Sequence, residues 1–388
     1  MANVRLACTA LAAALAISGC ATRTDPSFSP DGSRLAYATE GSGGESDLWI
    51  RSGSSTVVVS HGVHGDVAWS PDSRMLAFDR VRGDEPESTV LFQVGKGSSA
   101  RRTGVGDPFA WTPWGLASVE LDPKPAETKR SQWRAGRPLS PTTSGGEYQR
   151  GRRVWILDGR TLRRRFSFTA PFVTASMTSL GAKGLIGSRG SEVWFWDGSH
   201  CRRTPKLSNL EPLYVVGDGR TVVLAGLATD GKPEHETTTL LTWRPGFDSQ
   251  PNRIATLDFP IPPSCLGQSL SVKGSRDGTL AVSVNYFMPK PEDADQFFAL
   301  IQQFDLEHTP KMEDQEVNNQ VSQALVAILL RGTTHQSVMV HVPHRPWYKA
   351  YGHHGGPFDA DMRLTVDPAG RAFAVTSGQQ PEIVPIRR

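Results

Sequence analysis

The amino-acid sequence predicts an all-β fold of repeated four-stranded units, and three observations support this prediction. A phrase built around a Ser-Pro-Asp turn recurs at a spacing of about 41 residues, and a second phrase with alternating apolar residues follows several of its copies. The 388 residues also include 38 Gly and 28 Pro, which are turn formers. A period of about 40–45 residues is typical of propeller blades, so we predict a β-propeller, with seven blades favoured and six or eight left open.

The first phrase is clearest in DPSFSPDGSRLAY (25–37) and DVAWSPDSRMLAF (66–78), and it is degraded in DPFAWTPWGLASV (107–119). Proline sets φ for the turn, aspartate bonds the turn backbone, and glycine tolerates a positive φ. Apolar residues alternate with smaller ones after the turn, as in a second strand. We therefore interpret each copy as a two-stranded hairpin, with weaker copies at 174–188, 214–226, 271–284 and 364–377.

The second phrase ends in glycine, which indicates a third strand followed by its exit turn. It occurs at 47–53, 89–97, 153–159, 192–198 and 239–246. A poorer fourth strand follows at 55–60, 163–168 and 252–259. A four-stranded unit cannot bury both of its faces alone, so we expect the units to pack against their neighbours in a ring.

Two stretches interrupt the repeat. Residues 121–150 are polar, rich in proline and without periodicity, and we interpret them as a loop insertion between the second and third strands of blade three. A second insertion is expected at about 306–362, between the copies around Asp277 and Pro368. Within it, residues 312–332 could form a helix, or a strand after a polar linker.

The first 19 residues indicate an export signal rather than part of the fold. Arg5 precedes a mostly apolar stretch, residues 6–18, that is too short to cross a bilayer as a helix. The sequence ISGC (17–20) resembles the lipobox of bacterial lipoproteins. That resemblance implies cleavage before Cys20, lipid attachment at Cys20, and a mature chain anchored at the periplasmic or other extracytoplasmic face of a bacterial membrane. A plain secretory signal is the alternative.

Two further cysteines, Cys201 and Cys265, remain after loss of the signal and lipidation of Cys20. In an exported protein two such cysteines can form a disulfide. The loop between them would be long, and the sequence leaves this pairing open.

The phrase F/W-S-P-D-G/S, followed by L-A-Y/F, resembles the WD40-like propeller repeat of the TolB family. The match is strongest in 26–37 and 67–78, and weaker copies extend it over most of 25–388. The resemblance implies a propeller, periplasmic exposure and protein partners at the cell envelope. The chain departs from the TolB pattern because its first repeat starts a few residues after a predicted lipid anchor, so only the propeller is carried over.

The same repeat precedes the hydrolase domain of prolyl-oligopeptidase-like peptidases, and HGGP (354–357) resembles their oxyanion loop. Such an enzyme needs a G-x-S-x-G nucleophile elbow, which the sequence does not contain, so we interpret HGGP as part of a loop.

Asp25, Asp66 and Asp107 recur at equal spacing before the first strands of successive blades. This regularity indicates a structural role in bonding neighbouring blades, and we assign no catalytic residue.

Histidines gather near the C-terminus, where His341, His344, His353 and His354 could supply ligands for zinc or copper. Their spacing matches no established zinc pattern. We therefore favour a polar, aromatic-rich loop over HVPHRPWYKAYGHHGG (341–356), with no metal and no cofactor.

A cluster of arginines is predicted on the edge strands of blade three and in the adjoining loop. Charge on outer strands keeps sheet edges soluble, which is the simpler interpretation. The alternative is contact with lipid headgroups or an acidic partner. The cluster contains Arg130, Arg134, Arg137, Arg152, Arg153, Arg160, Arg163, Arg164 and Arg165.

These observations favour a non-enzymatic, monomeric, lipid-anchored scaffold that binds a protein or peptide partner at the cell envelope. The two insertions are the expected contact surfaces, because loops on a rigid scaffold commonly carry binding. A net charge of only +3 and the predicted export argue against nucleic acid. Two alternatives stay open: a lyase or hydrolase acting on a glycan or peptide at a central channel, and a metal- or ligand-sensing propeller.

Overall fold

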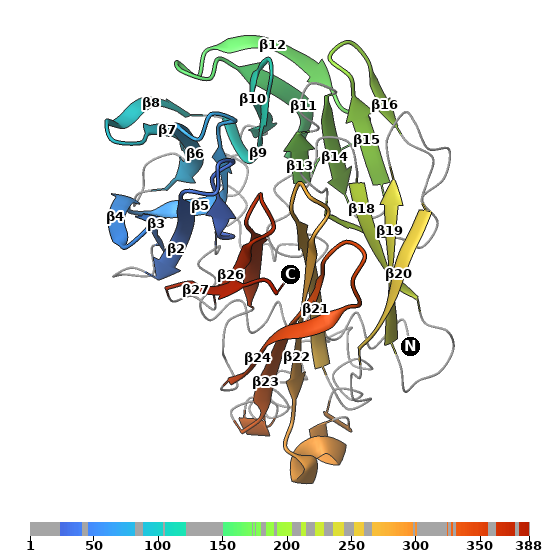
Figure 1. The fold of residues 1–388 in the computed structure, drawn as a ribbon. Coiled ribbons are helices and arrows are strands. Elements are labelled where there is room, and N and C mark those ends of the chain that lie inside the picture. Colours follow the sequence, from blue (N-terminus) through green and yellow to red (C-terminus); the bar gives the residue numbers. More distant parts are fainter. Residues whose placement is uncertain are drawn as a thin grey trace, which may run out of the picture. The chain divides into compact units, whose positions relative to one another are not determined.

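The computed structural model describes residues 24–387 with gaps, the longest of which are 82–87, 122–149, 204–210, 215–221, 229–235, 244–251, 260–265, 301–323 and 356–361. The described residues form 27 strands in seven sheets, six with four strands and one with three (Figure 1). The chain divides into two compact units: an N-terminal unit of residues 21–224 and 242–252, and a C-terminal unit of residues 225–241 and 253–388. Among the described residues, no helix has the length and apolar character to cross a membrane.

The N-terminal unit contains sheets 1–4, and in each of them consecutive strands pair antiparallel in chain order. Sheets 1 and 2 consist of β1 (Ser27–Phe28), β2 (Leu35–Glu40), β3 (Ser46–Ser52), β4 (Ser55–Ser60), β5 (Val63–Trp69), β6 (Met75–Arg80), β7 (Ser88–Gln93) and β8 (Gly97–Thr103). Sheets 3 and 4 consist of β9 (Val105–Thr112), β10 (Gly115–Leu121), β11 (Arg150–Leu157), β12 (Arg164–Thr169), β13 (Ser176–Ser179), β14 (Leu185–Arg189), β15 (Glu192–Trp196) and β16 (Cys201–Arg203).

The C-terminal unit contains sheets 6 and 7, and the strands of sheet 5 are divided between the two units. Sheet 5 consists of β17 (Glu211–Tyr214), β18 (Val222–Ala228), β19 (Glu236–Trp243) and β20 (Asn252–Phe259). Sheets 6 and 7 consist of β21 (Leu266–Gly274), β22 (Leu280–Met288), β23 (Thr333–His341), β24 (Tyr348–Gly355), β25 (Arg363–Val366), β26 (Ala372–Thr376) and β27 (Glu382–Pro385). A short 3-10 helix, η3 (Pro291–Asp293), follows β22.

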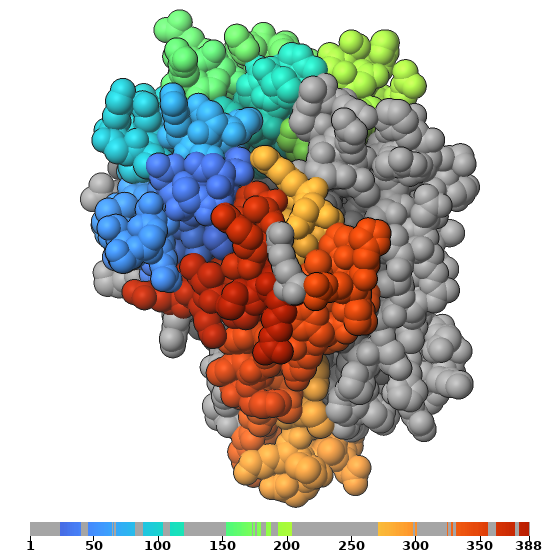
Figure 2. All heavy atoms as spheres, viewed as in Figure 1, coloured from blue at the N-terminus to red at the C-terminus, as the bar shows by residue number. Residues whose placement is uncertain are grey.

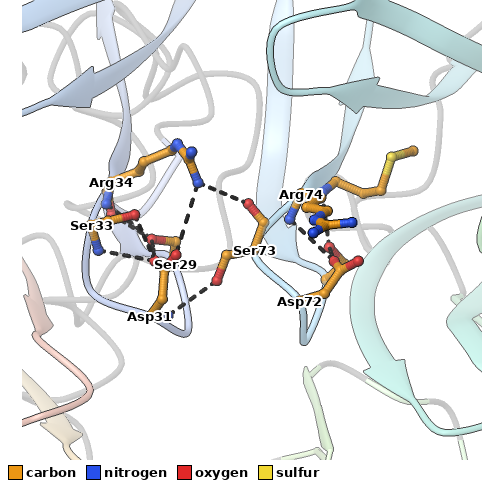
Figure 3. A network of polar contacts seen from close by, with 9 residues as sticks. Ser29, Asp31, Ser33, Arg34, Asp72, Ser73 and Arg74 are labelled. Atoms are coloured by element: carbon orange, nitrogen blue, oxygen red, sulfur yellow. Dashed lines mark hydrogen bonds and ion pairs between the residues drawn. The ribbon is translucent and has the colours of Figure 1, made fainter.

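The Ser-Pro-Asp turns close the hairpins between the first two strands of sheets 1 and 2. In sheet 1 the Ser29 hydroxyl donates to Asp31 Oδ1 at 2.6 Å, and the same carboxylate oxygen accepts from the Ser33 backbone at 3.0 Å (Figure 3). In sheet 2 the Ser70 hydroxyl donates to Asp72 Oδ1 at 2.6 Å. Hydrogen bonding to the ionised carboxylate lowers the pKa of Asp31 to about 2, so the turn aspartate is an anion at neutral pH.

Neighbouring turns also contact each other. Ser73 has φ of 60°, in the left-handed region that Gly32 occupies at the matching place in the first turn. Its hydroxyl accepts from the Asp31 backbone at 3.1 Å, and its carbonyl oxygen accepts from Arg34 Nη1 at 3.1 Å (Figure 3). In the C-terminal unit the Arg276 backbone donates to the Pro368 carbonyl oxygen, so the turns of sheets 6 and 7 are joined in a related way.

The hydrophobic core of each unit lies between neighbouring sheets, as expected for units that cannot bury both faces alone. Sheets 1 and 2 bury Leu48, Leu76 and Phe78 between them, and sheets 3 and 4 bury Ile156 and Trp194. In the C-terminal unit sheets 6 and 7 share a third cluster that includes Val338, Val340 and Phe373.

The seven predicted hairpins coincide with the first two strands of the seven sheets, so the all-β propeller prediction is confirmed. The predicted third and fourth strands also match, for example at β3, β4, β11 and β12. Among the described residues no sheet combines strands from both ends of the chain, because sheet 1 uses residues 27–60 and sheet 7 uses residues 363–385.

Two expectations near the C-terminus were wrong. The range 306–362 is not entirely an insertion, because it contains β23 and β24, the third and fourth strands of sheet 6. The predicted loop over 341–356 likewise contains β24, where Tyr351 pairs with Val338 across the sheet. Polar residues such as His353 concealed this strand, because an outermost strand exposes much of its surface to solvent. Residues 122–149 of the other predicted insertion lie outside the described residues.

Candidate functional site

The outermost strands of sheets 2, 3 and 4 each carry two adjacent arginines and no acidic residue. Figure 1 shows these strands, β8, β12 and β16, at the margins of their sheets, and Figure 2 shows β8 and β12 at the surface. We call this surface the basic rim and define it as Arg101, Arg102, Arg153, Arg163, Arg164, Arg165, Arg202 and Arg203.

The local pattern of β12 explains why the rim is both charged and ordered. Phe168 points toward sheet 4, where its ring stacks on Trp196 with centroids 4.6 Å apart and planes 9° apart. Phe166 also reaches the Trp196 ring, at 5.9 Å, although its side chain is 39% exposed. Arg164 and Arg165 are exposed. The strand is therefore anchored by aromatic packing while its guanidinium groups remain open to solvent.

Two rim arginines bind backbone carbonyl oxygens and so have defined positions. Arg102 Nη1 donates to the Leu162 carbonyl oxygen at 2.8 Å, which joins sheet 2 to sheet 3. Arg165 Nη1 donates to the Trp114 carbonyl oxygen at 2.8 Å. Burial, together with the positive charge of Arg164, lowers the pKa of Arg102 from its ordinary value. The guanidinium groups of Arg102 and Arg164 therefore lie close enough for their charges to repel each other.

Trp155 lies beneath two further rim arginines. The Arg164 guanidinium carbon is 4.1 Å from the Trp155 ring centroid, and that of Arg153 is 5.8 Å away. A cation over an indole face is favourable by roughly 0.5–1 kcal/mol at an exposed site. The Trp155 indole nitrogen is itself buried without a hydrogen-bond partner. The indole thus holds both cations in place without neutralising them.

Acidic groups near the rim are already engaged in turns. Asp158 Oδ1 accepts from the backbones of Arg160 and Thr161, and these bonds lower its pKa from the ordinary value. Its other carboxylate oxygen lies 3.8 Å from Arg165 Nε. This contact is exposed and therefore weak, and guanidinium groups exposed to solvent can accept carboxylates or other anions.

The predicted arginine cluster is only partly brought together by the structure. Arg164 and Arg165 lie on the predicted edge strand, whereas Arg152 and Arg153 lie on the neighbouring strand β11. Arg130, Arg134 and Arg137 lie outside the described residues. Sequence reasoning missed the arginines of β8 and β16, although a signal was available, because an Arg-Arg pair occurs in the fourth strand of three successive repeats.

Cys201 begins β16 at one end of the rim. It carries a free thiol whose pKa is raised to about 12 by burial and by the Asp197 carboxylate. Cys20 and Cys265 lie outside the described residues, so the lipid attachment and the disulfide stay predictions.

The predicted metal candidates lie at two separate places on the hairpin of β23 and β24. His341 ends β23 and stacks on Trp347 at 4.9 Å, with His344 in the turn that follows. His353 and His354 pair instead with Gln336 and His335, near the start of β23. The described residues contain no group of three or more His, Cys, Asp or Glu side chains placed to share a metal ion.

The structural role predicted for the repeated aspartates stays a prediction, because the side chains of Asp66 and Asp107 lie outside what the structure describes. Asp66 and Asp107 lie within β5 and β9 rather than before them. Tryptophans near the ends of these strands bond neighbouring sheets: Trp69 Nε1 donates to the Ser27 carbonyl oxygen at 3.0 Å, and Trp111 Nε1 donates to the Ala68 carbonyl oxygen at 2.9 Å. Of the HGGP phrase, His354 and Gly355 end β24, and residues 356–357 lie outside the described residues.

The fold and the sheet topology define the chain as a β-propeller protein. No family model matches the sequence, and no curated protein matches it. Among solved structures, the chain is similar to the propeller domain of the Trilobed protease from Pyrococcus furiosus, which is described as having an open velcro topology. The TM-score is 0.50 and the sequence identity is 10%, and the match covers 92% of this chain and 91% of that chain. At this identity the similarity shows the fold alone.

Two further solved structures have lower scores. The propeller domain of Myceliophteria thermophila Cps50 (Swd1) matches with a TM-score of 0.49 and 12% identity, covering 94% of this chain and 97% of that one. TolB from Acinetobacter baumannii matches with a TM-score of 0.37 and 14% identity, covering 65% and 61% of the two chains.

Proposed function

We propose that the chain is a non-enzymatic, lipid-anchored propeller scaffold at the bacterial cell envelope, and that its basic rim binds an acidic protein or peptide partner. The single observation that carries this proposal is the composition of β8, β12 and β16, which hold six arginines and no acidic residue. Solubility of an edge strand requires charge but not charge of one sign, and mixed charges would serve equally well.

The chemistry of the rim favours a polypeptide over a lipid surface. All its cations are arginine, whose planar guanidinium binds a carboxylate with two parallel hydrogen bonds. Arg153 and Arg164 flank an indole, and arginine and tryptophan are the residue types that dominate binding energy at protein interfaces. Acidic side chains of a partner would therefore find directional contacts as well as a positive field.

A titration with an oligo-glutamate peptide tests the proposal. The detergent-solubilised full chain is compared with R163E/R164E, which reverses two exposed rim charges, and with R51E/K96E, which reverses two charges outside the rim. The two double variants alter the net charge equally. We expect the dissociation constant to rise at least about tenfold in the rim variant and to change by less than about twofold in the control.

Three results would contradict the proposal. Equal weakening in both variants would show that only net charge matters. Unchanged binding in the rim variant would place the peptide elsewhere. Phosphatidylglycerol vesicles that bind through the rim more tightly than the peptide would identify a membrane contact instead.

A further inference from the structure

Three aromatic side chains form a row across one face of sheet 6. Tyr286, His335 and His354 are direct cross-strand partners on β22, β23 and β24. The Tyr286 and His335 rings stack with centroids 5.1 Å apart and planes 2° apart. The His335 and His354 rings meet edge to face, with centroids 4.5 Å apart. The row fixes the orientation of His335 and leaves His354 exposed to solvent.

The two imidazoles face each other through the same ring nitrogen. His335 Nδ1 and His354 Nδ1 are 2.8 Å apart, a hydrogen-bond distance in which one nitrogen donates and the other accepts. Burial, followed by the charges of His354 and Lys349, lowers the pKa of His335. A lowered pKa favours the neutral imidazole, which is the form that binds metals.

From this geometry we propose that His335 and His354 form a copper(II) site, with solvent completing the coordination. Two imidazole nitrogens about 2.0 Å from a metal lie about 2.8 Å apart when they subtend a right angle, but about 3.3 Å apart at a tetrahedral angle. The observed 2.8 Å is the length of the hydrogen bond in the metal-free pair, and at this separation the two nitrogens can reach one ion at a right angle once each ring turns its lone pair off the hydrogen-bond axis. Tetragonal nitrogen and oxygen coordination is characteristic of copper(II), whereas zinc prefers tetrahedral sites.

Metal binding requires one proton to move within the pair. The histidine that carries hydrogen on Nδ1 shifts to the tautomer with hydrogen on Nε2, so that both Nδ1 lone pairs face the metal. This proton transfer between the two nitrogens of one ring releases no net proton, and copper keeps its oxidation state throughout. The site is distinct from the basic rim and does not depend on the function proposed for it.

Lys349 sets a limit on the affinity of this site. It lies on β24, and its positive charge acts on His335. Its side chain lies over Gly352, where a Cβ atom added to the glycine would be 2.9 Å from the Lys349 Cε atom. A cation held near the pair opposes a second cation, so K349Q should strengthen copper binding.

A copper titration of the full chain against a competing chelator, followed by electron paramagnetic resonance, tests the proposal. We expect one equivalent with an axial spectrum showing equatorial nitrogen coupling, weakened at least about tenfold in H335Q and in H354Q and strengthened in K349Q. H341Q, at the other end of β23, is the control and should bind as the native chain does. The double variant H335Q/H354Q should retain any copper that binds elsewhere on the chain, and this amount is subtracted from the copper bound by the native chain.

Circular dichroism confirms that each variant is folded before the titration. Affinity and spectrum unchanged in H354Q would overturn the proposal. Equal loss in H341Q and H354Q, or stronger binding of zinc alone than of copper by the native chain, would overturn it as well.

Discussion

Replacing Trp69 with phenylalanine should destabilise the protein more than the same replacement at Trp49, although each indole donates one hydrogen bond. Trp69 is 7% exposed and its indole donates to the Ser27 carbonyl oxygen of the neighbouring sheet at 3.0 Å. Trp49 is half-buried and donates to the Thr39 hydroxyl within its own sheet at 2.9 Å. Only the first bond joins two sheets.

The expected size follows from two contributions. Loss of the Trp69 donor leaves a part-buried carbonyl oxygen without its partner, which costs about 1–3 kcal/mol. The smaller ring also leaves a gap between the sheets, so we expect a total of about 2–4 kcal/mol for W69F. The half-buried Trp49 donates to a hydroxyl of its own sheet, which water can reach more easily than the Ser27 carbonyl oxygen between two sheets, so W49F should cost about 1 kcal/mol or less. Trp111, which is half-buried, should fall between the two.

Urea unfolding followed by far-ultraviolet circular dichroism measures these differences without relying on tryptophan fluorescence. The predicted order of midpoints, from lowest to highest, is W69F, W111F, W49F and the native chain. Equal midpoints for W69F and W49F would refute the claim that the repeated tryptophan stabilises the packing of one sheet on the next.

Three other predictions concern single residues. Gly184 has φ of 138°, and a Cβ atom there would lie 1.9 Å from the Trp196 carbonyl oxygen, so G184A should lower the free energy of unfolding by about 3 kcal/mol. The control G95A, where φ is 79° and the space is open, should lower it by about 1 kcal/mol. The urea midpoints of both variants would check this difference. The pKa of Asp31 is lowered from 3.8 to about 2, so the Asp31 carboxylate contributes fully to stability above pH 3.8 and loses that contribution as the pH falls through 2. In S29A, which lacks the hydroxyl donor, an NMR titration should find the Asp31 pKa shifted upward. The Cys201 thiol, whose pKa is raised to about 12, should react slowly with a thiol reagent at pH 8 in the folded chain and rapidly in urea. Peptide mass spectrometry would measure the labelling, and fast labelling of the folded chain would contradict the burial of this thiol.

The repeat was predictable because its turn has local chemical requirements. Proline, aspartate and glycine report backbone conformation directly, and Asp31 and Asp72 could be recognised without knowledge of distant contacts. Strand β24 was missed because an exposed strand can carry almost any polar sequence, as His353 and His354 illustrate.

The candidate surfaces depended on tertiary structure to different degrees. Arg164 and Arg165 were predicted on an edge strand because they follow a strong third-strand phrase. The pairing of His335 with His354 could not be read from the sequence, because it is set by the register between two strands joined across a turn. The roles of Trp69 and Trp111 were likewise hidden, since a tryptophan in a strand predicts burial but not the partner of its indole nitrogen.

Affinity capture with the full chain, from the cells that produce it, tests the central claim most directly. Native chain, R163E/R164E and R51E/K96E are compared, and mass spectrometry quantifies what each retains. We predict one stoichiometric acidic partner, retained by the native chain and the control and lost from the rim variant. Capture of the same partner by all three, or of none by the native chain, would contradict a scaffold that binds through its basic rim.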